Sequence, residues 1–357
     1  MQKELVLVIN PGSTSTKLGL FTREEAIHIE KVDHSGTDIA DMHSIADQLP
    51  LRIEIIDKTF KPWIKDHKLV AVVGRGGLLK PIKSGVYSIN DDIMSDTINC
   101  KYASHASNLG ASIAYGIAQE YDVPSYIVDP VTVDEFIPEA KISGVPEIRR
   151  RSRLHALNIN ACVRKAAAGI HKEVEDSNFI IAHLGGGISI AAVEKGRIID
   201  CNDALLGMGP FSPERAGALP IDGVIGLARK YTDQELKVKL TKQSGIKAYL
   251  GTNDMKEVED RISAGDEAAA LIFRAMIYQI AKELGAMATT LCGDVDGVII
   301  TGGQANSTYT VDLIYDRVGF IAPKIVFPGE NELESMAEGG FRAADGLQDV
   351  LIYRSEK

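Results

Sequence analysis

Two segments of the chain share one pattern, in which an apolar run, a short turn of small and polar residues and a second apolar run follow one another. In the first half, residues 5–9 and 18–21 flank the turn NPGSTSTK, and in the second half residues 179–182 and 190–193 flank HLGGGIS. Apolar, β-branched runs bounded by Gly, Asn and Ser predict strand–turn–strand units. The two copies share little sequence, so they predict a repeated structure rather than a sequence repeat.

Helical spacing alternates with further strand-like runs along the rest of the chain. Helices are expected at 105–120, 156–168, 267–291 and 332–347, with Asp266 as a cap of the third, although Gly339 and Gly340 interrupt the last. Short buried strands are expected at 69–73, 126–128 and 298–301. This alternation predicts an α/β class.

Two domains are expected, because 357 residues are many for one hydrophobic core. The strand–turn–strand pattern restarts near residue 150, so we place the domains at 1–155 and 156–357.

Composition excludes several functional classes. A formal net charge of −10 argues against a nucleic-acid or anionic membrane surface, and the basic run at 149–153 is short. The four cysteines are far apart and form no CxxC pair, which disfavours a disulfide scaffold or a zinc site and fits a reducing compartment. No apolar stretch is long enough for a membrane span and the N-terminus lacks a signal peptide pattern, so a cytoplasmic protein is expected.

The first turn contains the residue types that bind phosphate. Glycine allows backbone N–H groups to approach an anion, hydroxyls and lysine donate to phosphate oxygens, and an asparagine carbonyl suits magnesium or its waters. The residues concerned are Asn10, Gly12, Ser13, Thr14, Ser15 and Lys17. A polar hairpin turn of no further function is an equally good interpretation of this segment alone.

Two later segments can serve the same ligand. The bare amides of Gly185, Gly186 and Gly187 could cradle a second phosphate, with His183 beside them, although a buried core histidine is the alternative. The segment VIITGGQANS suits a flat ligand such as adenosine, through Gly302, Gly303, Gln304 and Asn306, and it also suits a plain strand-to-helix turn. The dinucleotide fingerprint and the GxxxxGK[ST] loop are absent.

The segments INPGSTSTK and FIIAHLGGGISIAAVEKG resemble the two signatures of the acetate and butyrate kinases, the acetokinase family. The blocks VVGRGG, RRSRLHALN, GPFSPERAGALP, TGGQANS and PGENELESMAEGG are similar to family blocks too, so the resemblance covers nearly the whole chain. NPGS, GPFSPERAG and the compact length are more similar to the butyrate kinase branch. The family belongs with sugar kinases, heat-shock chaperone ATPases and actin.

The resemblance implies two ribonuclease-H-like (actin-like ATPase) domains with the active site in the cleft between them. Adenosine would lie on the second domain and the carboxylate pocket on the first, to which the last helix can return. The implied reaction is reversible, direct in-line transfer of the ATP γ-phosphoryl group to a short-chain carboxylate such as butanoate. A carboxylate is already an anionic nucleophile at neutral pH, so no general base is needed, and cations and positioning should dominate catalysis.

The resemblance also implies roles for individual residues. Arg75 and Arg215 would clamp the carboxylate and the phosphoryl group, because a guanidinium binds oxyanions in pairs. His155 would donate to the transferring group, His183 would lie near the nucleotide phosphates, and Asp129 would position the acyl phosphate or a metal-bound water, unless it caps a helix.

The same resemblance implies a Mg²⁺ site and an assembly. Asn10 and Glu332 would hold Mg²⁺ through water, with Glu330 as a competing choice, while His105 could equally cap or pack. Related kinases assemble as dimers or larger forms, so a homo-oligomer is expected.

Several alternatives stay open. Acetate, propionate or isobutyrate could be the substrate, since one methylene changes selectivity by only about 1–3 kcal/mol. An actin- or chaperone-like nucleotide switch, or a non-catalytic relative, is the alternative from another class. The acyl preference, the direction of flux, the oligomeric state and domain closure are not predicted.

Overall fold

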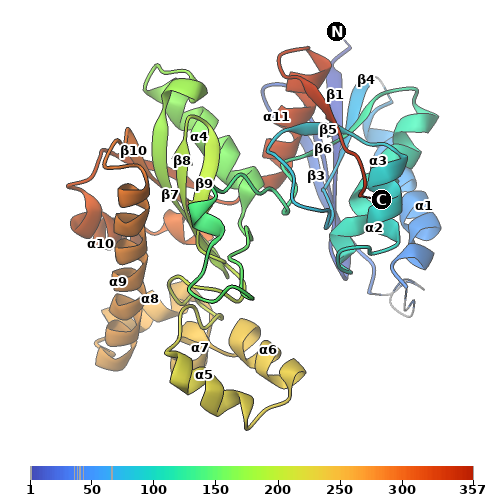
Figure 1. The fold of residues 1–357 in the computed structure, drawn as a ribbon. Helices are drawn as coiled ribbons and strands as arrows, with labels where there is room; N and C mark the ends of the chain where they lie inside the picture. Colours follow the sequence, from blue (N-terminus) through green and yellow to red (C-terminus); the bar gives the residue numbers. More distant parts are fainter. Residues whose placement is uncertain are drawn as a thin grey trace. The chain divides into compact units, whose positions relative to one another are not determined.

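The computed structural model describes residues 2–356 except 36, 38, 40, 41, 43 and 66. The chain divides into two compact units (Figure 1). The first unit is Met1–Val133 with Asn331–Lys357, and the second unit is Asp134–Glu330. These bounds differ from the predicted domain ranges of 1–155 and 156–357, because residues 134–155 group with the second unit. The last helix groups with the first unit, a return that the resemblance allowed.

The first unit is built on one seven-stranded sheet with the strand order β12-β5-β6-β4-β1-β2-β3. Strands β1, β2 and β3 form an antiparallel meander, and β4 and then β6 add parallel to β1. The bounds of its strands are β1 (Glu4–Pro11), β2 (Ser15–Phe21), β3 (Ala26–Asp33), β4 (Lys68–Gly74), β5 (Val86–Ser88), β6 (Ser125–Val128) and β12 (Val350–Ile352).

The second unit repeats this topology in a five-stranded sheet of order β11-β10-β7-β8-β9. Strands β7, β8 and β9 form the antiparallel meander, and β10 and then β11 add parallel to β7. Its strands are β7 (Asn178–Leu184), β8 (Ile188–Glu194), β9 (Arg197–Cys201), β10 (Gly297–Gly302) and β11 (Lys324–Pro328). The predicted strand–turn–strand segments are therefore β1–β2 and β7–β8, the first two strands of each sheet.

Helices accompany both sheets, which confirms the predicted α/β class (Figure 1). The first unit contains α1 (Leu49–Phe60), α2 (Asp91–Ile98), α3 (Leu109–Glu120) and α11 (Glu332–Ala344). The second unit contains α4 (Ala156–Gly169), α5 (Ile221–Ala228), α6 (Asp233–Lys242), α7 (Gly245–Leu250), α8 (Met255–Ser263), α9 (Glu267–Thr290) and α10 (Thr308–Val318). Asp266 caps α9 as predicted, since its side chain accepts from Ala269 N at 2.9 Å. Within the described residues, no helix is long and apolar enough to cross a membrane.

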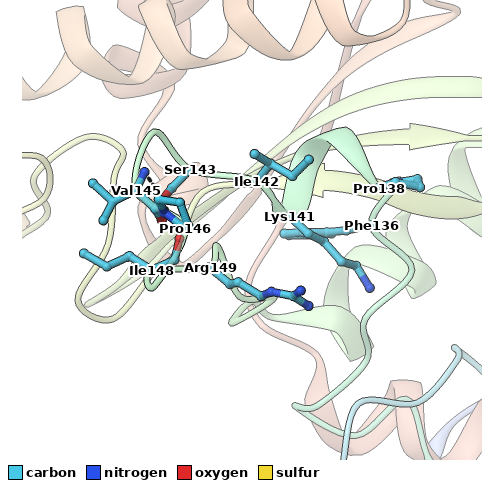
Figure 2. A pocket seen from close by; sticks show the side chains of 9 residues that line it. All are labelled: Phe136, Pro138, Lys141, Ile142, Ser143, Val145, Pro146, Ile148 and Arg149. Atoms are coloured by element: carbon cyan, nitrogen blue, oxygen red, sulfur yellow. Dashed lines mark hydrogen bonds between the residues drawn. The ribbon is translucent and has the colours of Figure 1, made fainter.

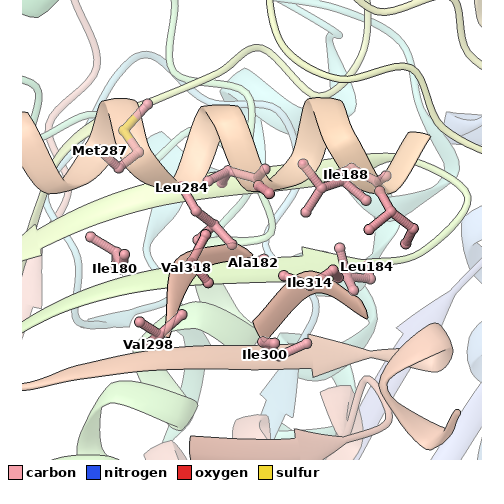
Figure 3. Close-up of a cluster of buried hydrophobic side chains, with 14 of the residues drawn as sticks. Ile180, Ala182, Leu184, Ile188, Leu284, Met287, Val298, Ile300, Ile314 and Val318 are labelled. Carbon is pink, nitrogen blue, oxygen red and sulfur yellow. The ribbon is translucent and has the colours of Figure 1, made fainter. Parts of the chain in front are cut away.

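The core of the second unit lies between its sheet and the helices α9 and α10. Ile180, Ala182 and Leu184 alternate along β7 toward one face, as residues two apart in a strand must. Leu284 and Met287 of α9 and Ile314 and Val318 of α10 pack on this cluster (Figure 3).

The sheet of the first unit is covered on both faces. Leu5, Leu7 and Ile9 of β1 pack in one cluster with residues of α1 and α3. The alternate residue Val6 faces α11, whose Gly340 lies close to it.

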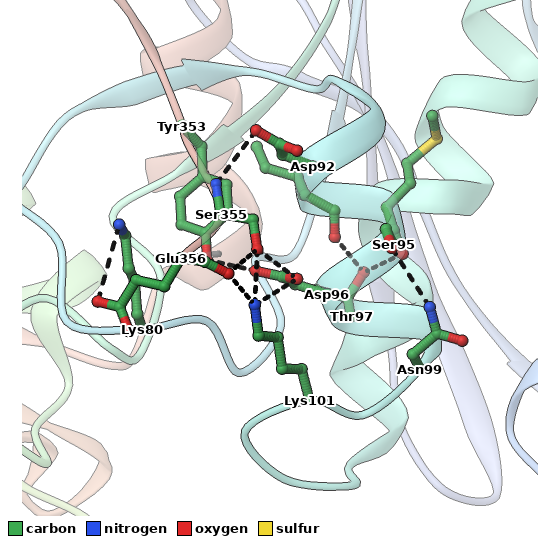
Figure 4. A network of polar contacts seen from close by, with 12 residues as sticks. Lys80, Asp92, Ser95, Asp96, Thr97, Asn99, Lys101, Tyr353, Ser355 and Glu356 are labelled. Atoms are coloured by element: carbon green, nitrogen blue, oxygen red, sulfur yellow. Dashed lines mark hydrogen bonds and ion pairs between the residues drawn. The ribbon is translucent and has the colours of Figure 1, made fainter.

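The C-terminal segment is fastened to α2 by a polar network in the first unit (Figure 4). The Tyr353 hydroxyl donates to Asp96 at 2.7 Å, and Ser355 donates to the other oxygen of the same carboxylate at 2.8 Å. Asn90 donates to the Tyr353 carbonyl at 2.9 Å. Burial raises the pKa of the Tyr353 phenol, which stays protonated as a donor. The segment thereby places β12 beside β5, at one edge of the sheet.

Candidate functional site

The β1–β2 turn presents small polar residues at the end of β1. Gly12 N donates to Ser15 O at 2.7 Å and closes the turn, in which Ser13 and Thr14 are exposed. Lys17 is exposed on β2, directly opposite Asn10 in the strand pair. The six residues predicted to handle phosphate in this segment are thus contiguous at one end of the meander.

Asn10, Glu332 and Arg75 are brought together within the first unit. Asn10 Nδ2 donates to Glu332 Oε2 at 2.9 Å, and Arg75 Nη2 lies 3.1 Å from Glu332 Oε1. Glu332 is the first residue of α11 and Asn10 the penultimate residue of β1, so helix and strand meet at this carboxylate.

This group has the donor chemistry of a magnesium site. Carboxylate and amide oxygens are hard ligands, and Mg²⁺ keeps several waters rather than requiring a full protein cage. No cluster of three or more His, Cys, Asp or Glu side chains able to hold a metal occurs in the part of the chain that the structure describes. A Mg²⁺ ion on Glu332 and Asn10 would therefore depend on water and nucleotide oxygens for the rest of its shell.

Arg75 is buried directly after β4. It is 9% exposed, and its backbone N–H donates to Ile9 O at 2.8 Å. Nη1 is buried and donates to no acceptor among the described residues, so this nitrogen is available to an anionic ligand. The backbone here tolerates no side chain on Gly74, because a Cβ would lie 2.1 Å from Gly110 O.

His105 lies near this arginine. Burial lowers the pKa of His105, and the charge of Arg75 lowers it further. The ring Nδ1 accepts from Ser107 N at 3.1 Å, so His105 caps the short helix 106–108. The sequence left a capping role open for His105, and the structure shows that His105 has this role.

The Asp129 carboxylate accepts a backbone hydrogen bond at the end of β6. It is 2% exposed with φ of 38°, and Oδ1 accepts from Gly85 N at 2.8 Å. No helix begins within the described residues 130–138, so Asp129 does not cap one. Its proposed contact with the acyl phosphate or a metal-bound water stays a prediction.

Two histidines stack in the second unit. The rings of His155 and His183 are 3.9 Å apart between centroids, with planes inclined by 12°. His155 Nδ1 lies 2.9 Å from Ser189 Oγ, and His183 Nδ1 lies 2.9 Å from Asn158 Oδ1. The two histidines are thus neighbours, although β7 supplies His183 and His155 precedes α4, and their separate roles stay predictions.

The glycine-rich β7–β8 turn lies against Arg215. A Cβ on Gly187 would lie 2.1 Å from Arg215 Nη1, so a side chain here would displace the Arg215 guanidinium. Arg215 Nη1 donates to Ala204 O at 2.6 Å, while its Nε is buried and donates to no described acceptor. Burial lowers the pKa of Arg215, and Glu214 and Asp203 partly counter this effect.

The segment after β10 meets the same turn. Gln304 Nε2 donates to Gly185 O at 3.0 Å, and Gly302, with φ of 90°, approaches Leu184 so closely that a Cβ would lie 2.5 Å from its carbonyl oxygen. Asn306 Nδ2 donates to Gly303 O at 2.9 Å. The two segments predicted to bind phosphate and adenosine are therefore adjacent, because β7 and β10 are neighbours in the sheet.

Glu330 belongs to the second unit, unlike Glu332. Its carbonyl accepts from Asn158 Nδ2 at 2.6 Å, and its Oε1 would lie 3.5 Å from a Cβ on Gly185. The structure thus places Glu332 with Asn10 and Glu330 with the glycine-rich turn.

A hollow of about 550 Å³ lies elsewhere on the second unit (Figure 2). Six apolar side chains, one serine and two cations line it: Phe136, Pro138, Lys141, Ile142, Ser143, Val145, Pro146, Ile148 and Arg149. None of the predicted site residues is among these lining residues, so the hollow takes no part in the candidate site.

Three residues with contacts to the site have no signal in the sequence. Asn158 contacts His183, and Arg52 and His34 contact the β1–β2 turn. Arg52 lies on an amphipathic helix where arginine normally marks the solvent face, so only the folded contacts reveal it.

The family comparison matches the second half of the chain. Residues 144–337 match the model of the Acetokinase family. "Probable butyrate kinase 2" of Caldanaerobacter subterraneus subsp. tengcongensis is 47% identical over 351 residues, with 98% of this chain and 99% of the relative covered. "Probable butyrate kinase" of Coprothermobacter proteolyticus is 46% identical over 352 residues, with the same coverage of both chains.

Solved structures of kinases share the fold. The Porphyromonas gingivalis acetate kinase matches with a TM-score of 0.76 at 20% identity, covering 95% of this chain and 100% of the other. A propionate kinase from Francisella tularensis matches with a TM-score of 0.74 at 20% identity, covering 95% and 99%. The predicted fold of two actin-like ATPase domains is confirmed by this likeness. With near full-length relatives at 46–47% identity and the family model over residues 144–337, the chain belongs to the Acetokinase family.

Proposed function

We propose that the protein is a butyrate kinase, which transfers the γ-phosphoryl group of ATP to butanoate and yields butanoyl phosphate and ADP. The observation that carries the proposal is the buried Nη1 of Arg75, a guanidinium nitrogen with no described protein acceptor beside the Asn10–Glu332 pair. A buried cationic donor of this kind suits a carboxylate or a phosphoryl oxygen. The names of the 46–47% identical relatives support butanoate as the acceptor.

The chemistry places few demands on proton transfer. A carboxylate oxygen attacks the γ-phosphorus, the bond between this phosphorus and the β-bridging oxygen breaks, and the electron pair leaves with ADP. No proton is gained or lost, because the nucleophile is already an anion. The barrier comes from repulsion between anions, so cationic and hydrogen-bonding groups do the catalytic work.

Named residues take these roles. Arg75 holds the carboxylate, and Arg215, with its unpartnered buried Nε, holds the transferring phosphoryl group. His155 donates to the equatorial oxygens of that group, and Asp129 positions the acyl phosphate. The reaction is reversible, so the same residues serve ATP synthesis.

The nucleotide takes the two turns and the segment after β10. The β1–β2 turn and the glycine-rich turn at 185–187, with His183, bind its phosphates, and residues 302–306 bind adenosine. Asn10 and Glu332 hold Mg²⁺, which when bound neutralises phosphate charge. Glu332 is preferred over Glu330 because Glu332 accepts from Asn10 Nδ2 within the first unit.

Hydroxamate trapping tests the proposed reaction. The protein is incubated with ATP, Mg²⁺, hydroxylamine and one of acetate, propionate, butyrate, isobutyrate or valerate, and acyl hydroxamate is measured. We expect the highest kcat/KM with butyrate, a loss of about 100-fold or more in Arg75→Ala, and partial recovery in Arg75→Lys, since removal of one charged donor typically has this effect.

Arg23→Ala is the matched control in the same unit, because Arg23 is an exposed arginine paired with Asp345. It should leave the rate unchanged. A preference for isobutyrate, acetate or propionate would correct the substrate within the class. ATP hydrolysis without any acyl hydroxamate would contradict the kinase proposal and favour a nucleotide switch.

We also propose that the protein is a cytoplasmic homo-oligomer. Helix α5 supports the assembly: its sequence is IDGVIGLA, and none of its eight residues, all described, is buried. Ile221 is 76% exposed and Ile225 is 50% exposed, which is unusual for large apolar side chains of an isolated subunit. Light scattering on the wild type and Ile221→Glu should show a dimer or larger form that the variant weakens. A monomeric wild type would contradict the proposal.

A further inference from the structure

Arg52 is a buried cation beneath the β1–β2 turn. It belongs to α1 and has no exposed surface. Its guanidinium donates to three neutral oxygens: Gln48 Oε1 at 3.1 Å, Thr16 Oγ1 at 3.1 Å and Ser13 O at 3.2 Å. Among the described residues no carboxylate pairs with it, and burial lowers its pKa. A buried cation without an anionic partner is costly to keep.

His34 supports the same turn from the end of β3. Its ring Nε2 lies 2.8 Å from Thr16 Oγ1, the hydroxyl that also accepts from Arg52, and its backbone N–H donates to Thr14 O at 2.8 Å. Thr16 and His34 are both buried. Arg52 and His34 therefore form one buried support under the turn.

The support holds two consecutive carbonyls of the turn, and Gly12 of the turn itself holds the next one. Arg52 binds the Ser13 carbonyl, His34 N binds the Thr14 carbonyl, and Gly12 N binds the Ser15 carbonyl at 2.7 Å. In a trans peptide the N–H of the next residue points opposite to the carbonyl, so a held Ser13 carbonyl turns the Thr14 N–H away from Arg52. Ser13 and Thr14 are exposed, and their amides donate to no acceptor in the described part of the chain.

We propose that Arg52 is a positioning residue for the phosphate chain of ATP. By holding the Ser13 carbonyl, it directs the amide N–H groups of the turn outward to phosphate oxygens, and it adds a fixed positive charge behind them. Arg52 acts through the turn and touches no substrate. The inference rests on the proposed function only in taking ATP as the ligand. This role explains why a charged guanidinium is buried at Arg52, which packing alone does not.

The test separates phosphate binding from stability. The affinities of ATP and AMP are measured by calorimetry for the wild type, Arg52→Met and Arg52→Lys, and Tm is measured without ligand. We expect Arg52→Met to weaken ATP binding about tenfold or more, a change of about 1.4 kcal/mol. AMP, which lacks the β- and γ-phosphates, should bind equally to all three, and Arg52→Lys should recover part of the affinity.

Two further variants keep the result interpretable. Thr16→Val removes the hydroxyl shared by Arg52 and His34 while preserving side-chain shape, and it should weaken ATP but not AMP even if Arg52→Met does not fold. Arg23→Met removes an exposed arginine of the same unit and should change neither affinity.

Opposite results overturn the inference. If Arg52→Met and Thr16→Val lower Tm but bind ATP like the wild type, Arg52 has a structural role only. If the wild type binds ATP no more tightly than AMP, the turn is not a phosphate site. Failure of the proposed function is distinguishable, because a wild type that binds ATP but forms no acyl hydroxamate loses the kinase assignment while the Arg52 comparison stands.

Discussion

Asn158 holds His183 in one tautomer. Its Nδ2 faces the Glu330 carbonyl, which can only accept, so its Oδ1 must face His183 Nδ1. The Thr301 hydroxyl donates to the same Oδ1 at 3.2 Å. His183 Nδ1 therefore carries a proton, which it donates to Asn158 Oδ1 at 2.9 Å. The chemical state of His183 depends on a residue that never needs to touch the nucleotide.

Replacing Asn158 should allow the proton to occupy either ring nitrogen of His183. In Asn158→Ala we expect kcat to fall about 10- to 100-fold, because an unsatisfied buried group costs about 1–3 kcal/mol. Nitrogen NMR of labelled histidine should show an Nδ1-protonated His183 in the wild type and a tautomer mixture in the variant. Asn99→Ala, at an exposed amide in the first unit, is the control. An unchanged tautomer in Asn158→Ala would refute the argument.

Two histidines, the buried His34 and the exposed His105, should make the first unit sensitive to mild acid. Burial lowers the pKa of His34 and of His105 below 6.5, with a further contribution from Arg52 and Arg75 respectively. Below pH 6.5 the unfolded chain therefore binds protons that the folded unit does not. The free energy of unfolding consequently decreases as the pH is lowered. The free energy of unfolding stops decreasing once the pH is below the lowered pKa of each histidine in the folded state.

Thermal unfolding checks the sign of this effect. Tm should fall between about pH 7.5 and about pH 5.5, and His34→Gln should make the slope shallower because one proton no longer contributes. His171→Asn, at an exposed histidine of the second unit, should leave the slope as in the wild type. A steeper slope in His34→Gln would show that the folded state, rather than the unfolded state, binds that proton.

At the scale of elements, the glycines of α11 allow the helix to reach the sheet. A Cβ on Gly340 would lie 2.6 Å from Val73 Cγ2, and one on Gly339 would lie 2.7 Å from both γ-carbons of Val128. The interruption that these glycines cause in the helical pattern is therefore a packing requirement. Because α11 begins at Glu332, its depth on the sheet also sets the Glu332–Asn10 contact.

Two alanine substitutions in helices should have opposite effects. Gly340→Ala should destabilise the protein by about 1–3 kcal/mol, since overpacking displaces Val73 or the helix. Gly285 of α9 has no atom within 4 Å of an added Cβ, so Gly285→Ala should be neutral or stabilising by up to about 1 kcal/mol. Urea unfolding measures both. Equal effects would mean that helix propensity, not packing, decides at Gly340.

At the scale of the whole molecule, the second unit is one continuous segment with its own sheet and core, whereas the first unit needs both ends of the chain. A fragment of residues 134–330 should therefore unfold cooperatively on its own. A fragment of residues 1–133 lacks α11 and β12 and should not, unless residues 331–357 are rejoined by a linker. Circular dichroism during thermal unfolding tests both fragments. A cooperative transition in 1–133 alone would contradict this division.

The elements that could be predicted are those with local causes. The turns after β1 and β7, the strands around them and the cap at Asp266 follow from glycine, hydroxyl and apolar patterns within a few residues. The short helices α5 to α8 were not predicted, and α5 carries an apolar sequence without the polar face that marks an amphipathic helix.

Long-range contacts explain why the rest could not be predicted. Asn10 and Glu332 are 322 residues apart in the chain, and Arg52 meets the Ser13 carbonyl across 39 residues. Composition and spacing identify residues that can bind phosphate, because those chemical properties belong to each side chain. Which side chain is buried, which carboxylate faces Asn10 and which histidine tautomer forms depend on partners that only packing brings together.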